Sequence, residues 1–145
     1  MMDQKIYILI VEDELEVMDA LVSDLQKFES VFPIETCNTA EEASEVIGQI
    51  IKAGDQIGLI LCDHVLPGKN GVDLLVELQQ EEETEWSRKV LVTGQAGLDD
   101  TVEAINKADL NHYIAKPWTR EQLHEVVVEQ LTDYVIHKEL NPLQY

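Results

Sequence analysis

Five side chains that could take part in chemistry directly follow apolar runs of the sequence: Glu12, Asp13, Asp63, Thr93 and Lys116. Clustered carboxylates repel one another, and a hard divalent cation such as Mg2+ relieves that repulsion because it prefers oxygen ligands. An ammonium group and a hydroxyl group beside them can bind the oxygens of a phosphoryl group. A carboxylate can also accept that group as a nucleophile. The set predicts phosphoryl transfer onto an aspartate, with Asp63, which stands alone after its run, as the acceptor.

The spacing of apolar residues predicts the elements that bring these side chains together. Short apolar runs, typical of strands that are covered on both faces, alternate with stretches of helical period. The predicted strands are Ile6–Val11, Phe32–Cys37, Ile57–Cys62, Lys89–Val92 and His112–Ala115. After each strand, apolar residues at helical spacing predict a helix. The pattern is weakest for the fourth helix, over 98–108. Two helices begin with capping boxes, Thr39-Ala-Glu-Glu42 and Thr119-Arg-Glu-Gln122.

Five strand–helix units in a row predict an α/β fold with a parallel sheet and helices on both of its faces. In such a sheet, ligands bind at the carboxyl ends of the strands. All five candidate side chains are predicted at that edge. We expect one domain over residues 1–137, followed by a C-terminal tail or the start of a linker over 138–145.

Composition and charge exclude several classes of function. The chain has 10 Lys and Arg against 29 Asp and Glu, a net charge of −19, which argues against direct binding to nucleic acid. No run approaches the roughly 20 apolar residues of a membrane span, and the N-terminal run lacks the flanks of a signal peptide. Cys37 and Cys62 lack metal-ligand spacing and are expected to be reduced core residues of a cytoplasmic protein. The acidic segment 81–85 is expected to be an exposed loop.

Each candidate residue alone also has a purely structural explanation. An aspartate after a strand is commonly a turn or cap residue, and the pair Glu12-Asp13 could simply complement a helix dipole. Thr93 could be a turn residue and Lys116 an ordinary surface lysine. These explanations do not account for such residues at the ends of four strands in one chain.

Four motifs make the sequence resemble a receiver domain of bacterial two-component response regulators, the CheY-like family. They are ILIVEDE (8–14), LILCDHVLPGKNG (59–71), VLVTG (90–94) and YIAKPW (113–118). The resemblance runs from about Lys5 to Val135. It implies a flavodoxin-like (βα)5 doubly wound sandwich whose five-stranded parallel sheet has the strand order 2-1-3-4-5.

The resemblance also implies the metal site and the phosphoacceptor. Glu12 and Asp13 match the acidic pair that binds Mg2+, the implied cofactor. Asp63 matches the aspartate that takes a phosphoryl group from a phosphohistidine, and it is a metal ligand too. The backbone carbonyl of Val65 matches a further metal ligand.

The resemblance also implies roles for Thr93, Lys116 and Tyr113, and a backbone conformation at Pro117. Thr93 and Lys116 match the residues that bind the phosphoryl group and that, with Asp63, form the catalytic set. Tyr113 matches the aromatic residue that changes rotamer together with Thr93. Pro117 is implied to follow a cis peptide bond.

The sequence departs from the common family pattern near the acceptor. His64 stands where a hydrophobic residue is usual, and Gly94 replaces a common alanine. Val65 and Gln95 occupy the variable positions that, in this family, modulate loss of the phosphoryl group. The Val65 side chain has no polar atom to orient an attacking water, which predicts a long-lived phosphorylated state.

The predicted function is a phosphorylation-dependent signalling switch rather than a conventional enzyme. The expected phosphodonor is a sensor histidine kinase or a phosphotransfer protein. The expected output face comprises the helix over 98–108, the fifth strand and the helix after Thr119. It would bind an output domain, a downstream protein or a second copy in a phosphorylation-dependent homodimer, and neither nucleic acid nor a membrane.

Three alternatives differ in class. A degenerate receiver would act as an interaction module without phosphorylation. A phosphatase of the haloacid dehalogenase type would need a second aspartate where Val65 stands. A flavodoxin-like nucleotide binder would need a Ser-, Thr- or Gly-rich phosphate loop where the sequence has VEDELE, which repels anions.

Overall fold

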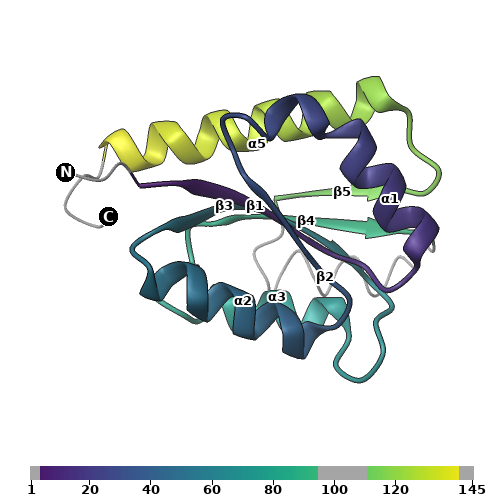
Figure 1. The fold of residues 1–145 in the computed structure, drawn as a ribbon, viewed down its shortest axis with the longest axis horizontal. Helices are drawn as coiled ribbons and strands as arrows, with labels where there is room; N and C mark the ends of the chain where they lie inside the picture. The colour runs from purple at the N-terminus through teal and green to yellow at the C-terminus, as the bar shows by residue number, and fades with distance from the viewer. Residues whose placement is uncertain (1–3, 95–110, 141–145) are drawn as a thin grey trace.

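A computed structural model describes residues 4–94 and 111–140 of the chain. Its core is a parallel sheet of five strands in the order β2-β1-β3-β4-β5 (Figure 1). The strands are β1 Ile6–Val11, β2 Ile34–Cys37, β3 Gln56–Asp63, β4 Arg88–Thr93 and β5 His112–Ala115. The predicted fold class and strand order are confirmed.

Helices cover both faces of the sheet (Figure 1). They are α1 Leu15–Asp24, followed by the 3-10 turn η1 Gln26–Phe28, then α2 Ala40–Lys52, α3 Gly71–Gln79 and α5 Arg120–Leu140. α1 and α5 lie on one face, and α2 and α3 lie on the other. The helix predicted over 98–108 lies outside the described residues. Within the described part, no helix is both long and apolar enough to cross a bilayer.

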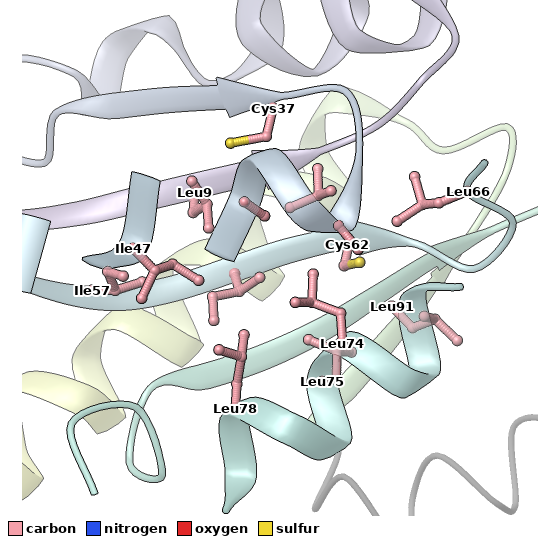
Figure 2. Close-up of a cluster of buried hydrophobic side chains, with 14 of the residues drawn as sticks. Leu9, Cys37, Ile47, Ile57, Cys62, Leu66, Leu74, Leu75, Leu78 and Leu91 are labelled. Atoms are coloured by element: carbon pink, nitrogen blue, oxygen red, sulfur yellow. The ribbon is translucent and has the colours of Figure 1, made fainter. Parts of the chain in front are cut away.

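Two hydrophobic clusters, one on each face, hold the sheet between the helices. Along β1, Leu9 and Val11 pack into the cluster with α2 and α3 (Figure 2), whereas Ile8 and Ile10 pack into the cluster with α1 and α5. All four side chains are fully buried. Burial on both faces explains why the central strands are continuous apolar runs rather than alternating ones.

Both predicted helix caps are present. The Thr39 hydroxyl accepts a hydrogen bond from the Glu42 amide at 3.0 Å, and the Glu42 carboxylate accepts one from the Asn38 amide at 2.8 Å. The Thr119 hydroxyl accepts one from the Gln122 amide at 3.1 Å. Side-chain caps satisfy amides that have no partner within the helix, so these residues fix where α2 and α5 begin.

Some predicted boundaries differ from the structure. The second strand begins at Ile34 rather than Phe32, because the Phe32 amide donates to the Phe28 carbonyl at 2.8 Å and completes a helical turn after η1. α5 continues to Leu140, past Val135, where its apolar spacing ends. Its last residues therefore lie in the segment expected to be a tail. Segment 81–85 is not simply an exposed loop, since Thr84 within it is buried.

Gly71, the first residue of α3, packs against the backbone of the predicted phosphoacceptor. A Cβ atom at Gly71 would lie 1.9 Å from the Asp63 carbonyl oxygen, and the Gly71 amide donates to the His64 carbonyl at 3.0 Å. Only a residue without a side chain fits there, so α3 starts directly behind β3 and the sequence GKNG connects them closely.

Gly71→Ala should therefore destabilise the protein, because the added methyl group forces α3 away from β3. We expect a loss of about 3 kcal/mol in the free energy of unfolding, measured by urea denaturation. Gly48→Ala is the matched control, because a Cβ at this exposed position within α2 meets nothing within 4 Å. It should stabilise the protein by up to about 1 kcal/mol. Equal unfolding midpoints for the two variants would contradict the assigned role of Gly71.

Candidate functional site

Four strands deliver the predicted site residues to one edge of the sheet. Glu12 and Asp13 directly follow β1, and Asp63 is the last residue of β3. Thr93 is the last residue of β4, and Lys116 directly follows β5. Because all strands are parallel, their carboxyl ends meet at the same edge. The predicted placement of all five residues is confirmed, while their chemical roles stay predictions.

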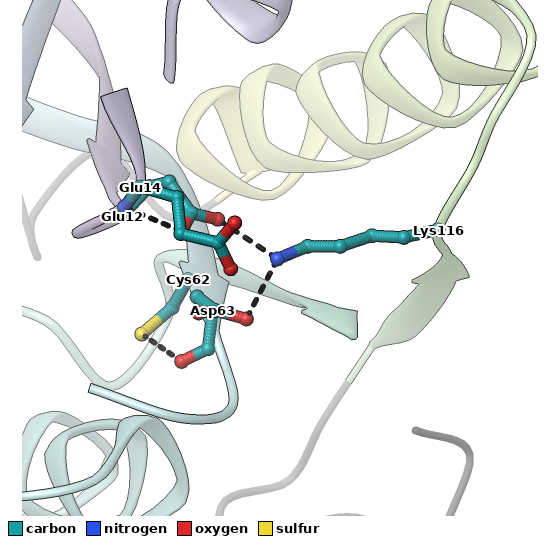
Figure 3. A network of polar contacts seen from close by, with 5 residues as sticks. All are labelled: Glu12, Glu14, Cys62, Asp63 and Lys116. Carbon is teal, nitrogen blue, oxygen red and sulfur yellow. Dashed lines mark hydrogen bonds and ion pairs between the residues drawn. The ribbon is translucent and has the colours of Figure 1, made fainter. Parts of the chain in front are cut away.

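A lysine joins two buried carboxylates at the centre of this site (Figure 3). The Lys116 ammonium lies 3.1 Å from an oxygen of Glu12 and 3.1 Å from an oxygen of Asp63. Glu12 is 1% exposed and Asp63 is 5% exposed, so both carboxylates are largely removed from water. The second oxygen of Glu12 accepts a hydrogen bond from the Glu14 amide at 3.1 Å. Charged groups this deeply buried are retained only when they are paired in this way.

The pKa values of the central pair reflect competition between burial and charge. Burial raises the pKa of Glu12, the nearby charge of Asp63 raises it further, and the contacts with Glu14 and Lys116 only partly oppose this rise. Burial lowers the pKa of Lys116, but its hydrogen bonds to Asp63 and Glu12 and their negative charges outweigh burial. The pKa of Lys116 is therefore raised, which keeps the ammonium charged and able to bind an anionic group.

The three carboxylates fit the donor set that Mg2+ prefers. One oxygen each of Glu12, Asp13 and Asp63 lie within 4.8 Å of one another. Asp13 is exposed, so a metal held here would remain open to water and to an incoming anion. Hard oxygen donors with retained water are typical of magnesium sites in proteins. Val65, the predicted backbone ligand, lies in the loop between β3 and α3 with its side chain 62% exposed.

The two predicted switch residues lie on neighbouring strands in different environments. Thr93 on β4 is 2% exposed, whereas Tyr113 on β5 is 43% exposed. The Tyr113 ring lies at the surface, with its centroid 6.2 Å from that of the His112 ring. The backbone also links Thr93 to the lysine, since the Lys116 amide donates to the Thr93 carbonyl at 2.8 Å.

The loop that carries Lys116 is anchored to α1 by a residue that sequence reasoning missed. Asp24, the last residue of α1, accepts hydrogen bonds from the Trp118 indole at 2.9 Å and from Arg120 at 3.2 Å. Its backbone carbonyl lies 2.5 Å from the His124 ring. The peptide bond between Lys116 and Pro117 is cis, as the resemblance implies. No motif marks Asp24; only its position at the end of a helix and the apolar spacing around it point to a contact.

The cysteine beside Asp63 is a buried packing residue. Cys62 is fully buried, and its sulfur lies 3.4 Å from the Asp63 carbonyl oxygen and 3.9 Å from that of Gly71. Burial raises the pKa of Cys37 to about 12 and that of Cys62 further still. Both remain free thiols, in agreement with the expected reduced core residues.

Comparisons with known proteins point to one family. The profile of the response regulator receiver domain matches residues 8–128. The hydrogenase transcriptional regulatory protein HoxA of Cupriavidus necator is 29% identical over 129 residues, which are 88% of this chain and 24% of HoxA. The chemotaxis protein CheY of Pseudomonas aeruginosa is 24% identical over 82% of this chain and 91% of CheY. The chain thus spans about a quarter of HoxA and most of CheY.

A solved structure shares both fold and sequence with the chain. It is a response regulator receiver domain protein (CheY-like) from Methanospirillum hungatei, with a TM-score of 0.78 and 28% identity. The match covers 93% of this chain and 99% of that one. The likeness therefore extends over nearly the whole of both chains.

Lys116→Met tests the charge balance of the site, because it removes the ammonium and keeps an apolar side chain of similar length. In the absence of metal, Glu12 and Asp63 would then face each other without a counter-charge. We expect the free energy of unfolding in urea with EDTA to fall by about 2 kcal/mol, and saturating Mg2+ to restore most of the loss. Lys52→Met, at an exposed position on α2, is the control and should change little. Wild-type stability of Lys116→Met in EDTA would contradict the pairing.

Wild type and Lys116→Met also allow the charge of Lys116 to be tested by changing the pH. The pKa of Lys116 is raised above its ordinary value of 10.5. Its stabilising contribution is therefore fully present below pH 10.5 and is lost as the pH rises through the higher value in the folded protein. The difference in unfolding free energy between wild type and Lys116→Met should be constant from neutral pH up to pH 10.5 and should shrink above it. A difference that already disappears near neutral pH would show that Lys116 is not the responsible group.

Proposed function

The chain belongs to the response regulator receiver domain family, and we propose that it is a phosphorylation-dependent signalling switch whose acceptor is Asp63. The observation that supports this most is the shared ammonium of Lys116, 3.1 Å from both Glu12 and Asp63 at the open edge of the sheet. Family relatives imply a histidine kinase partner and output domains. For this chain, both the histidine kinase partner and the output domain are part of the proposal.

The proposed reaction moves a phosphoryl group from a phosphohistidine to Asp63. An Asp63 carboxylate oxygen attacks phosphorus, an O–P bond forms, the N–P bond of the donor breaks, and the imidazole leaves and takes up a proton from water. The ammonium of Lys116 is proposed to bind an oxygen of the phosphoryl group by a charge-assisted hydrogen bond. The Thr93 hydroxyl, at the end of β4, is proposed to bind a second oxygen.

Glu12, Asp13 and Asp63 are proposed to hold Mg2+, which would offset negative charge during transfer. The burial of Glu12 and Asp63 supports this assignment, because a phosphoryl group brings further negative charge to carboxylates that already repel each other. The chain's own residues supply the remaining parts: a nucleophile, a cation and a hydroxyl group. Such a site phosphorylates itself from a donor and is not that of a conventional enzyme.

The output is proposed to leave through the face that contains β5 and α5. If Thr93 moves toward the phosphoryl group, it vacates space beside β5, and the exposed ring of Tyr113 can turn inward. The free energy for this shift is the difference in affinity of the two states for the phosphoryl group. An output domain, a downstream protein or a second copy would then distinguish the two states.

Asp63→Asn should abolish labelling by the small phosphodonor phosphoramidate, whereas wild type should be labelled only with Mg2+ present. Intact-mass measurement and peptide mapping give the readout. Asp19→Asn, at an exposed position on α1, is the matched control and should be labelled like wild type. Labelling of Asp63→Asn at another side chain would contradict the assignment of Asp63 as the acceptor. A wild-type chain that stays unlabelled with Mg2+ would favour the degenerate receiver. Turnover of many phosphate esters per chain would favour the phosphatase.

Amide exchange on the same samples tests the output face. Phosphorylated wild type should change exchange across residues 98–119, and Asp63→Asn treated in the same way should not. If labelling succeeds and this segment is unchanged, the proposed coupling through Thr93 and Tyr113 is wrong.

A further inference from the structure

α5 carries a second apolar face that no described element covers. Its inner face, with Leu123, Val127 and Leu131, is buried against the sheet. Farther round the same helix, Val128 is 50% exposed and Ile136 is 49% exposed. Single exposed apolar side chains are common on protein surfaces. These two, however, border one hollow.

That hollow, here called the α5 groove, lies between α5 and the segment that follows α1. It has a volume of about 300 Å3 and is lined by Phe28, Phe32, Val128, Leu131, Val135 and Ile136. Thr132 contributes the only polar side chain among the described lining residues. A hollow this large and this apolar is suited to the side chains of another molecule rather than to ordered water.

The rim of the groove on α5 is acidic. Glu121, Glu125 and Glu129 are all exposed and follow one another at intervals of four residues, so they form a row along the helix next to Val128 and Ile136. In the described part of the chain, none of the three forms an ion pair. Like charges at this spacing repel each other and slightly destabilise a helix. A row of this kind attracts a basic partner.

The opposite rim contains one basic side chain. The Lys27 ammonium lies 5.3 Å from the centre of the Phe28 ring, so this cation already rests on the apolar wall. The carboxylate row therefore remains the dominant charge beside the groove, on a chain whose net charge is −19.

Charge decides which occupant fits. A second copy would bring the same patch of both chains together, as symmetric pairs do, and with it two carboxylate rows and two strongly negative chains. We propose that the α5 groove is a docking site for an amphipathic helix of another protein, which places apolar side chains in the groove and Lys or Arg side chains against Glu121, Glu125 and Glu129. Helix-in-groove recognition of this type uses apolar anchors at i, i+3, i+4 and i+7.

This docking site shares α5 with the output face proposed above. The groove opens between α5 and the segment after α1, whereas the proposed output face combines α5 with β5. Binding in the groove requires neither phosphorylation of Asp63 nor Mg2+, so it can be tested on the unmodified protein, and failure of either proposal leaves the other standing.

The probe is a fluorescein-labelled peptide of about 15 residues built from Leu and Lys, with Leu at the anchor spacing. Fluorescence anisotropy should show saturable binding to the wild-type chain. The double variant Val128→Gln/Ile136→Gln, which keeps the charge unchanged, should weaken binding at least about tenfold. Leu15→Gln is the control, because it makes the same kind of change at an exposed position on α1 and should bind like wild type.

A second pair of double variants distinguishes the effect of the acidic row on peptide binding from the effect of the net charge. Glu125→Gln/Glu129→Gln should weaken binding several-fold, and Glu41→Gln/Glu45→Gln, which removes the same charge from exposed positions on α2, should not. Equal binding of a peptide with Gln in place of Leu would overturn the proposal, because attraction would then be electrostatic alone. Equal binding to the groove variant would also overturn it. Sedimentation that shows a dimer lost in Val128→Gln/Ile136→Gln would assign the groove to a second copy instead.

Discussion

Two buried carboxylates that share one ammonium are the constraint on which this structure depends. Glu12 and Asp63 project from the ends of two hydrogen-bonded strands, β1 and β3, where water cannot screen their repulsion. The Lys116 ammonium, 3.1 Å from each, offsets that repulsion. The arrangement has no spare positive charge, so any added anion requires a further cation. This balance of charges supports the proposal that the site needs a metal ion before it can accept a phosphoryl group.

The rest of the fold serves to hold that lysine in place. Lys116 reaches the carboxylates from β5, at the far side of β4, and its loop is tied back to α1 through Trp118 and Asp24. Gly71 allows α3 to pack directly behind Asp63. The two hydrophobic clusters supply the stability that such a site needs. Removal of either buried charge should therefore affect stability as well as chemistry.

Much of the fold was predictable because apolar spacing and helix capping depend on residues that are close together in the sequence. The aliphatic run Ile6–Val11 is buried on both faces, and the caps at Thr39 and Thr119 begin the helices where the capping boxes predicted. The candidate site was predictable for a related reason: parallel strands bring their carboxyl ends to one edge. Chemistry-bearing residues at those ends must therefore converge.

What the sequence did not reveal depends on contacts between distant residues. Lys89 was expected only as a strand residue, yet its ammonium is buried and lies about 3 Å from the Gln79 side chain and from the backbone carbonyls of Thr84 and Ser87. These contacts hold the acidic segment 81–85 close to the sheet. The hydrogen bonds of Asp24 across to α5 are equally non-local. No periodic pattern encodes them.

Fluorine NMR of beryllofluoride, a mimic of the phosphoryl group on aspartate, shows whether Asp63, Lys116 and Mg2+ act together. We expect bound fluorine signals for the wild-type chain only when Mg2+ is present, weaker binding for Lys116→Met, and no bound signal for Asp63→Asn. These results would mean that the acceptor, the shared ammonium and the metal act as one site. Bound signals in Asp63→Asn, or in wild type without Mg2+, would contradict it.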